Sequence, residues 1–341
     1  MEPLLLRAAI KRGFIVVAAN WPVVLIDFAV ESVARLALIL PVAGGALLVT
    51  VVAGSDVGAL FAGGVTEAAD IVVGSLTSAP GALVAFLTAV ALVAVGGEAV
   101  QFIVKSGTLS VMKRADEVAG EVQRLPIGAD SLRRAYAFRL EILIAAGRRF
   151  ARRGVLLSLW LGLVYAVVAL FYLAFVTEGM AVVESAWMPA WSAVMLGATS
   201  TAVVVIAIAN LAYTLLRVVI VTDDCGIGTA VGRLLRFAIE DARQVIGVFA
   251  VIGGIELAAA AVALFVAAAL APIAYLPFIG LLVVPLQAAI WLVRALAFEA
   301  LSLTSVAAYQ TQYRRFGQSR WGAGVSVAPE KDEAPVNDPQ A

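Results

Sequence analysis

The chain has 341 residues, of which 62% are hydrophobic and only 14% are charged, and its mean hydropathy is +1.00. Ordinary soluble domains carry about 25% charged residues, and a water-soluble fold of this composition would expose large apolar patches. The 24 basic and 24 acidic residues cancel, which argues against a nucleic-acid partner. A single cysteine, Cys225, excludes an intramolecular disulfide, and the chain has no histidine, the commonest metal ligand and acid–base group. We expect no metal and no cofactor.

The first 32 residues predict two interfacial helices. The first covers 3–19, and a break at 20–22 leads into the second, because Pro22 suits a helix start and Trp21 suits the headgroup level. A cleaved signal peptide is not expected, since the apolar run stops after seven residues. Three charged residues follow at four-residue spacing, on one stripe of a helix: Asp27, Glu31 and Arg35. The last two stand in the order that favours an ion pair.

Six apolar stretches are long enough to cross about 30 Å of hydrocarbon. They cover 33–54, 81–103, 154–176, 191–216, 246–271 and 278–302. The predicted fold is therefore an all-α, polytopic transmembrane helical bundle with six crossings, and its membrane domain spans 33–306.

The connecting segments 55–79, 177–190 and 272–277 contain no Lys or Arg, whereas 22 of the 24 basic residues lie in the alternate segments and termini. Basic residues favour the cytoplasmic side of a membrane. The pattern predicts a multi-pass protein of the bacterial inner membrane with both termini in the cytoplasm.

The cytoplasmic segment 104–153 is the most basic of these, and two amphipathic helices are predicted to lie in the membrane plane at the inner surface, over 131–153 and 229–243. Residues 307–341 are predicted to form a cytoplasmic tail that is disordered from about residue 318. The arginines of the first helix predict a face that binds anionic lipid headgroups. They are Arg133, Arg134, Arg148, Arg149, Arg152 and Arg153.

Two polar groups are candidate functional sites within the crossings. Counting residues along each crossing places one group near the bilayer midplane: Glu256, Tyr165, Ser200, Thr201 and Gln287. An acid at that depth often marks an ion or proton pathway, and its structural alternative is a protonated side chain that joins helices. The second group lies near the inner ends of the crossings and could converge on an inner vestibule: Glu98, Asn210, Arg294 and Glu299. For Arg294 and Glu299, snorkelling towards the headgroups is the favoured alternative.

Smaller motifs have structural explanations. The pairs Gly44-Gly45, Gly96-Gly97 and Gly253-Gly254 predict close helix packing. The adjacent acids Asp223 and Asp224 predict a cap for the helix that follows. After the second, fourth and sixth crossings the chain repeats small, apolar and then basic residues, a pattern compatible with three similar helical hairpins or with any cytoplasmic exit.

The segment 221–241 (VTDDCGIGTAVGRLLRFAIED), with Gly228, Gly232 and Arg236 in a spaced turn, resembles a group of poorly characterised six-helix bacterial membrane proteins. These are related to the membrane domain found beside glycerophosphodiester phosphodiesterases. The resemblance covers about residues 14–305 and implies a fold and a membrane location. The phosphodiesterase domain of that family is missing here, so no activity follows.

Three functions remain open on these residues. The leading expectation is a non-enzymatic protein that organises membrane lipids, through anionic headgroups at its arginine-rich inner face, or that organises a protein partner or a homo-oligomer. The first alternative is a transporter of a small solute, ion or lipid that uses the layer around Glu256. The second is a membrane-embedded enzyme, for which no nucleophile–base motif is found.

Overall fold

The computed structural model describes residues 5–52, 80–124, 126–182, 188–274 and 279–320, and over these ranges the protein is helical, with no strand. The long helices of this part are α2 (Trp21–Val52), α5 (Pro80–Val118), α7 (Leu140–Val182), α8 (Met188–Asp223), α10 (Ala242–Ala274) and α11 (Ile279–Arg320). The shorter elements are α1 (Leu6–Ala19), the 3-10 helix η1 (Val122–Arg124), α6 (Ala129–Ala135) and α9 (Ile227–Glu240). The all-α fold class is confirmed.

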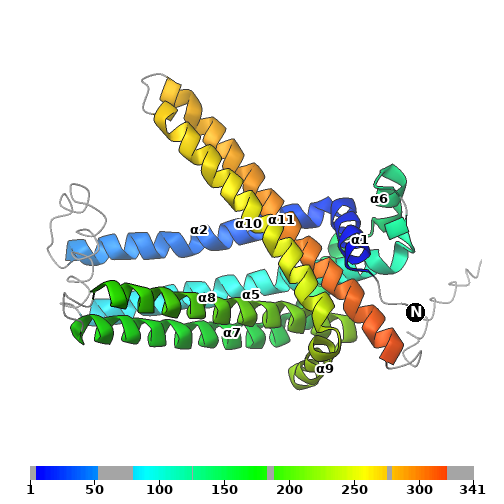
Figure 1. Ribbon diagram of the computed structural model, residues 1–341, viewed down its shortest axis with the longest axis horizontal. Coiled ribbons are helices and arrows are strands. Elements are labelled where there is room, and N and C mark those ends of the chain that lie inside the picture. Colours follow the sequence, from blue (N-terminus) through cyan, green and yellow to red (C-terminus); the bar gives the residue numbers. More distant parts are fainter. Residues whose placement is uncertain (1–4, 53–79, 125, 183–187, 275–278, 321–341) are drawn as a thin grey trace, which may run out of the picture.

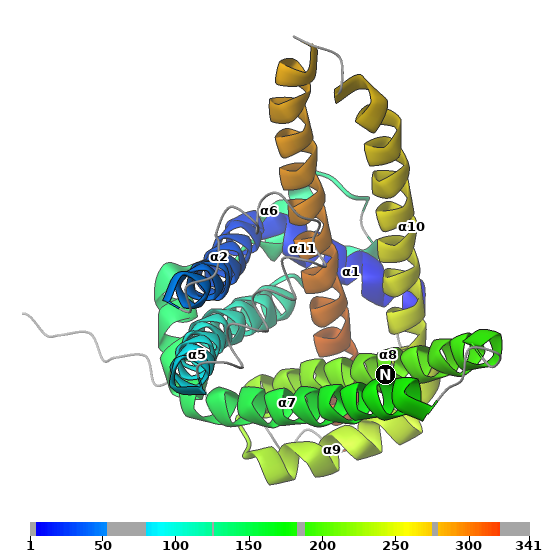
Figure 2. The ribbon, with the colours of Figure 1, turned by 90° about the vertical axis from the view of Figure 1, so that its left-hand side faces the viewer.

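The long helices pack in sequence order as three pairs, α2 with α5, α7 with α8, and α10 with α11 (Figure 1). The pairs diverge from a common base, as the legs of a tripod do. In Figure 2, α2 and α5 point towards the viewer, α7 and α8 run across the picture, and α10 and α11 rise from it. The base, where α1, α6 and α9 also lie, is called the hub below.

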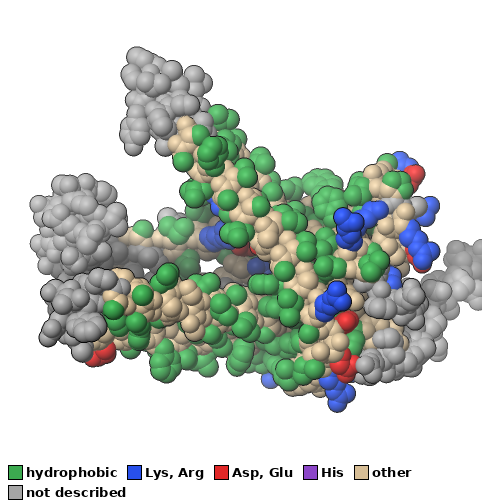
Figure 3. All heavy atoms as spheres, in the orientation of Figure 1, with side chains coloured by type: hydrophobic (Ala, Val, Ile, Leu, Met, Phe, Trp, Pro, Cys, Tyr) green, Lys and Arg blue, Asp and Glu red, His purple; other side chains and the backbone are tan. Residues whose placement is uncertain are grey.

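The hub holds the buried core of the protein. Its apolar residues come from the hub ends of the long helices and from α1 and α9, and the most deeply buried large ones are Ile15, Phe102, Leu109, Met112, Ile220, Phe237 and Tyr313. Along the three pairs, by contrast, large apolar side chains are exposed. In Figure 3 most of the basic side chains gather at the hub end, while apolar side chains cover α10 and α8.

Four helices of the described part are long and apolar enough to cross a membrane: Leu140–Gly179, Ala190–Asp223, Ala242–Val266 and Pro285–Gln318. In the first of these, no residue of the most apolar window is buried inside the protein. Because large apolar side chains without protein contacts need lipid around them, these helices identify a multi-pass membrane protein. Crossings by α2 and α5 as well remain a proposal.

The N-terminal break is confirmed, and Asn20 explains it. Its side-chain amide donates to the carbonyl oxygens of Val16 and Ala135, both at 2.8 Å, and its Oδ1 accepts the backbone N–H of Ala137 at 2.9 Å. The turn between α1 and α2 is thereby joined to the connection between α6 and α7. Helix α1 is not free at the surface, because one of its faces is buried against α11 and η1.

The prediction of a single in-plane helix over 131–153 is wrong. Helix α6 ends at Ala135, residues 136–139 are not helical, and α7 begins at Leu140 and continues without interruption to Val182. The first turns of α7 pack against α5, where Gly147 faces the backbone of Ile103 so closely that a Cβ would overlap it. Packing against α5 therefore sets the direction of this segment. The second amphipathic segment does form a separate helix, α9.

The prediction of a tail from residue 307 is also wrong for the part that is described. Helix α11 continues to Arg320, and Ala308, Gln310 and Tyr313 are almost completely buried in the hub. The predicted disorder from about residue 318 falls mostly on 321–341, which lie outside the described residues, while 318–320 are helical.

Close helix contacts occur at other glycines than those predicted. A Cβ on Gly44, Gly96, Gly253 or Gly254 would meet no atom within 4 Å. On Gly13 it would lie 2.7 Å from the carbonyl oxygen of Thr304, at the crossing of α1 and α11. Together with Gly107 and Gly147 on the facing sides of α5 and α7, this glycine lets the hub helices approach closely.

Candidate functional site

A buried ion network joins three helices inside the hub. Asp116 of α5 accepts hydrogen bonds from Arg12 of α1 at 2.5 Å, from Thr311 of α11 at 3.0 Å and from Arg314 at 2.7 Å. Arg12 and Asp116 are 5% and 8% exposed. Arg12 also donates to the backbone carbonyl of Asp116 at 2.6 Å and to Gln123 at 2.7 Å. Because these charged groups find their hydrogen-bond partners within the protein, the network has a structural role and holds α1, α5 and α11 together.

A second, partly buried group, called the carboxylate cluster here, brings together side chains of α2, α5, α8 and α11. It consists of Asp27 and Glu31 of α2, Lys105 of α5, Arg217 of α8 and Glu299 of α11. Glu299 is in hydrogen-bond contact with both Asp27 and Glu31. Lys105 Nζ lies 3.6 Å from Glu31 Oε2, and the predicted pair of Glu31 with Arg35 is confirmed.

The electrostatics of the cluster differ between its two α2 acids, which precede the predicted crossing. Asp27 is 2% exposed, and burial raises the pKa of its carboxyl, although the charges of Lys105 and Arg217 act in the opposite direction. Burial also opposes the ionisation of Glu31, but the charges of Lys105 and Arg35 outweigh it and lower the pKa of Glu31. Burial opposes ionisation at both acids of α2, but the neighbouring positive charges outweigh it only at Glu31.

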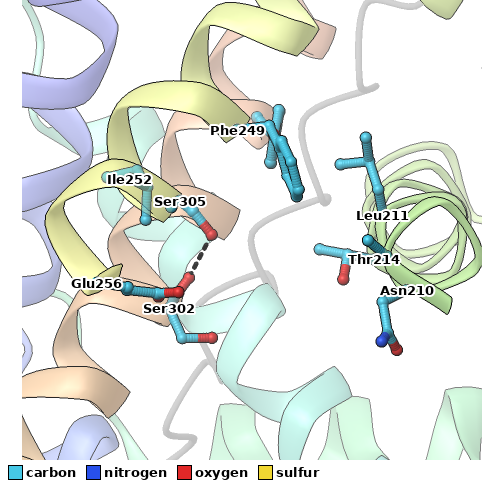
Figure 4. Close-up of a pocket in the computed structure, with 11 residues that line it drawn as sticks. Asn210, Leu211, Thr214, Phe249, Ile252, Glu256, Ser302 and Ser305 are labelled. Carbon is cyan, nitrogen blue, oxygen red and sulfur yellow. Dashed lines mark hydrogen bonds between the residues drawn. The ribbon is translucent and has the colours of Figure 1, made fainter. Parts of the chain in front are cut away.

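A cavity of about 320 Å³ lies between α8, α10 and α11. Figure 4 shows Glu256 of α10 beside Ser302 of α11, with Asn210 and Thr214 of α8 on the opposite wall. The Ser305 hydroxyl donates to the Ser302 carbonyl at 2.7 Å. The Glu256 carboxyl is half-buried, and no hydrogen bond or ion pair to it is found among the described residues. We call this the Glu256 cavity.

The structure does not bring the predicted midplane layer together. Ser200 and Thr201 are exposed and donate to carbonyl groups of their own helix, and Gln287 is not among the residues around Glu256. Tyr165 instead donates to Asn210 of the Glu256 cavity. The prediction fails because it took residue counts along each helix as depths on one common axis. The helices diverge from one another, so equal counts do not place residues in one layer.

The three described side chains of the predicted inner vestibule do not converge either. Glu299 turns inwards to the carboxylate cluster rather than towards headgroups. Arg294 is exposed, and its guanidinium lies 5.3 Å from the ring of Phe298, while Asn210 faces Tyr165. Glu98 lies on α5, and its side chain is outside the described residues.

The predicted arginine face divides into two groups. Arg149 and Arg153 both bind the Asp224 carboxylate, the latter at 2.7 Å. These contacts outweigh the effect of burial and lower the pKa of Asp224. The other four arginines of this face are exposed and have no partner in the described part: Arg133 and Arg134 on α6, and Arg148 and Arg152 on α7.

The two adjacent acids do not cap α9. Its N-cap residue is Gly226, which has no side-chain cap. Asp223 accepts a hydrogen bond from Arg233 at 2.5 Å and another from the Tyr313 hydroxyl. The pair of acids therefore binds arginines of α7 and α9.

Sequence reasoning missed most members of the buried groups. It treated Arg12 and Lys105 as cytoplasmic positive charges and did not single out Asp116 or Arg217. The sequence feature that could have indicated them is the charged stripe on α2. Its residues were paired only with one another, although charges on one helix face call for partners on a neighbouring helix. In the described part, no group of three or more His, Cys, Asp or Glu residues is arranged to hold a metal ion.

The chain matches no family model, no curated protein and no solved structure. The resemblance drawn from residues 221–241 therefore stays a prediction.

Proposed function

We propose that this protein is a non-enzymatic integral membrane protein of the bacterial inner membrane that binds and organises anionic lipids around a basic hub. In this arrangement the hub and both termini face the cytoplasm, and the tripod legs, including α2 and α5, cross the bilayer. The exposed arginines of α6 and α7 bind headgroup phosphates. A bound protein partner or a second copy of the chain would use the same hub surface.

The observation that carries this proposal is the change of side-chain type along the exposed face of α7. Arg148 and Arg152 are exposed, and from Leu156 onwards this face is apolar. Its exposed large residues are Leu156, Leu159, Trp160, Leu163, Val167, Leu170, Phe171, Leu173 and Phe175. At 1.5 Å per residue this stretch is about 30 Å long, the thickness of the hydrocarbon core. The two guanidinium groups then lie at the headgroup level, where anionic lipids attract them.

The chain supplies a matched pair of variants for a test. Arg148→Gln with Arg152→Gln removes two exposed charges. Arg149→Gln with Arg153→Gln removes the same charge, one position along the same helix, from residues that bind Asp224. Because a basic residue near an anionic surface contributes about 1 kcal/mol, the first double variant should bind phosphatidylglycerol roughly 30-fold more weakly. Native mass spectrometry in lipid mixtures measures the bound lipid.

The control double variant should keep its bound phosphatidylglycerol and lose thermal stability instead. Unchanged lipid binding by the Arg148/Arg152 double variant would contradict the proposed function. Equal losses in both double variants would show that net charge, and not the exposed face of α7, attracts the lipid.

The Glu256 cavity favours a second candidate, a transporter of a small solute, ion or lipid. A half-buried carboxyl beside hydroxyl and amide groups, within the membrane-spanning part, is the kind of group found along transport pathways. The structural alternative is a protonated carboxyl that contacts Ser302 and joins α10 to α11. Water access to Glu256 distinguishes the two.

The single native cysteine makes this measurement simple. In a Cys225→Ser background, Glu256→Cys should react with a water-soluble, membrane-impermeant maleimide if the cavity is hydrated. Leu257→Cys, whose side chain is 73% exposed on the outer face of α10, is the lipid-facing control and should not react. Absence of labelling at both positions would exclude the transport candidate and leave the lipid-organising function.

A further inference from the structure

The carboxylate cluster contains an unsatisfied atom that points to a ligand. Asp27 is 2% exposed, and its Oδ2 finds no hydrogen-bond donor in the part of the protein that the structure describes. Arg217, at 7% exposed, has an Nε without an acceptor. Buried polar atoms without partners are costly, so each requires an explanation.

Glu299, the neighbour of Asp27, explains the unsatisfied oxygen of Asp27. The Glu299 carboxyl is in hydrogen-bond contact with Asp27 and also with Glu31. Two ionised carboxylates are both acceptors and repel each other, so a hydrogen bond between them exists only when one of them carries a proton. Glu299 stands between the two acids of α2 and is therefore placed to donate to either.

The surrounding charges are compatible with one proton and not with a metal ion. The groups that face the three acids are Arg35 from α2, Lys105 from α5 and Arg217 from α8. A divalent cation at this position would be repelled by these basic side chains. A proton needs no set of ligands of its own, and it turns the contact between two acids into a hydrogen bond.

We propose that the carboxylate cluster is a binding site for one exchangeable proton, held on Glu299 and shared between Asp27 and Glu31. In the loaded state the Glu299 carboxylic acid donates to one ionised neighbour. On release the proton passes to water by way of Glu31, whose side chain is 20% exposed, and Glu299 is left as a carboxylate. The site is independent of the proposed lipid function, because none of its residues belongs to the arginine face.

The proton also joins two legs of the tripod. Asp27 and Glu31 lie on α2, whereas Glu299 lies on α11. Without the proton, three negative charges meet at this contact, and Arg35 and Lys105 already bind Glu31. Release therefore weakens the contact between α2 and α11, and the stability that the proton contributes is lost as the pH rises.

Infrared spectroscopy of the full-length protein in detergent tests the proposal, because a protonated carboxyl has its own carbonyl absorption. We expect this absorption to be present at about pH 7, where ordinary Asp and Glu are ionised, and to decrease as the pH is raised further. Glu299→Gln should remove the equivalent of one protonated carboxyl at neutral pH, and its melting temperature should vary less with pH. Glu256→Gln, in the separate cavity, is the control and should keep the Glu299 contribution.

Asp27→Asn provides a second measurement that does not depend on the folding of the Glu299 variant. Removing the Asp27 charge takes away one reason for Glu299 to keep its proton, so the absorption should vanish at lower pH than in the natural protein. The proposal is overturned if Glu299→Gln leaves the neutral-pH absorption unchanged, or if Asp27→Asn titrates as the natural protein does. It is equally overturned if Glu256→Gln alone removes all of the absorption.

Discussion

At the scale of single residues, the hub is unusual for its buried charges. Arg12 and Asp116 are nearly inaccessible, yet each makes several hydrogen bonds, and Arg314 and Thr311 complete the coordination of the carboxylate. A buried pair of this kind contributes little compared with an apolar replacement of both partners, but removal of one partner leaves a buried charge. The network therefore specifies how α1, α5 and α11 meet.

We therefore expect a large effect from one substitution on α1. Arg12→Ala should lower the free energy of unfolding by about 3 kcal/mol, the lower end of the effect of breaking a buried ion pair, because Asp116 loses its closest partner but keeps Arg314. Arg7→Ala, at an exposed position of the same helix, should change it by less than about 0.5 kcal/mol. Unfolding in a denaturing detergent, followed by circular dichroism, measures both. Equal stability of the two variants would show that the network is dispensable.

At the scale of helices, hydropathy located the long helices but not their ends. Helix α5 continues to Val118, α8 to Asp223 and α11 to Arg320, each well beyond the predicted inner limit. These extensions contain polar and charged residues, which hydropathy assigns to water. They are buried because the hub helices pack on one another, and the glycines at their crossings allow that packing.

We expect substitution by alanine to change stability in opposite directions at two glycines of α5. At Gly107 a Cβ would overlap the Leu143 carbonyl group, whereas at Gly96 it would meet no atom within 4 Å. Gly107→Ala should therefore destabilise the protein by about 1–3 kcal/mol through overpacking. Gly96→Ala should be neutral or stabilise by up to about 1 kcal/mol, because alanine favours the helix. Thermal unfolding in detergent compares them, and a neutral Gly107→Ala would contradict the close contact of α5 and α7.

At the scale of the whole molecule, the tripod separates a compact hub, which holds the buried core and most of the basic side chains, from three legs with exposed apolar side chains (Figures 1 and 3). The α7–α8 pair has its far end near Glu178 and its hub end near Arg139, and both side chains are exposed. Because the basic residues gather at the hub end, the proposed topology places the hub in the cytoplasm.

Labelling tests this orientation directly. In the Cys225→Ser background, Glu178→Cys should react with an impermeant maleimide in intact spheroplasts. Arg139→Cys should react only after the membrane is permeabilised. Labelling of Arg139→Cys from outside would invert the proposed topology and remove the basis for lipid binding at a cytoplasmic hub.

The sequence by itself determined that the chain is helical, that it belongs in a membrane, and that Glu31 and Arg35 pair, because all three follow from composition or from spacing within one helix. Only the tertiary structure decided that Glu299 meets Asp27, that Glu256 lies beside Ser302 rather than in a common layer, and that most of residues 307–316 are core rather than tail. Such contacts depend on the angles at which distant helices cross. Those angles are set by close approaches such as Gly13 on Thr304 and Gly147 on Ile103, which no periodicity along a single helix encodes.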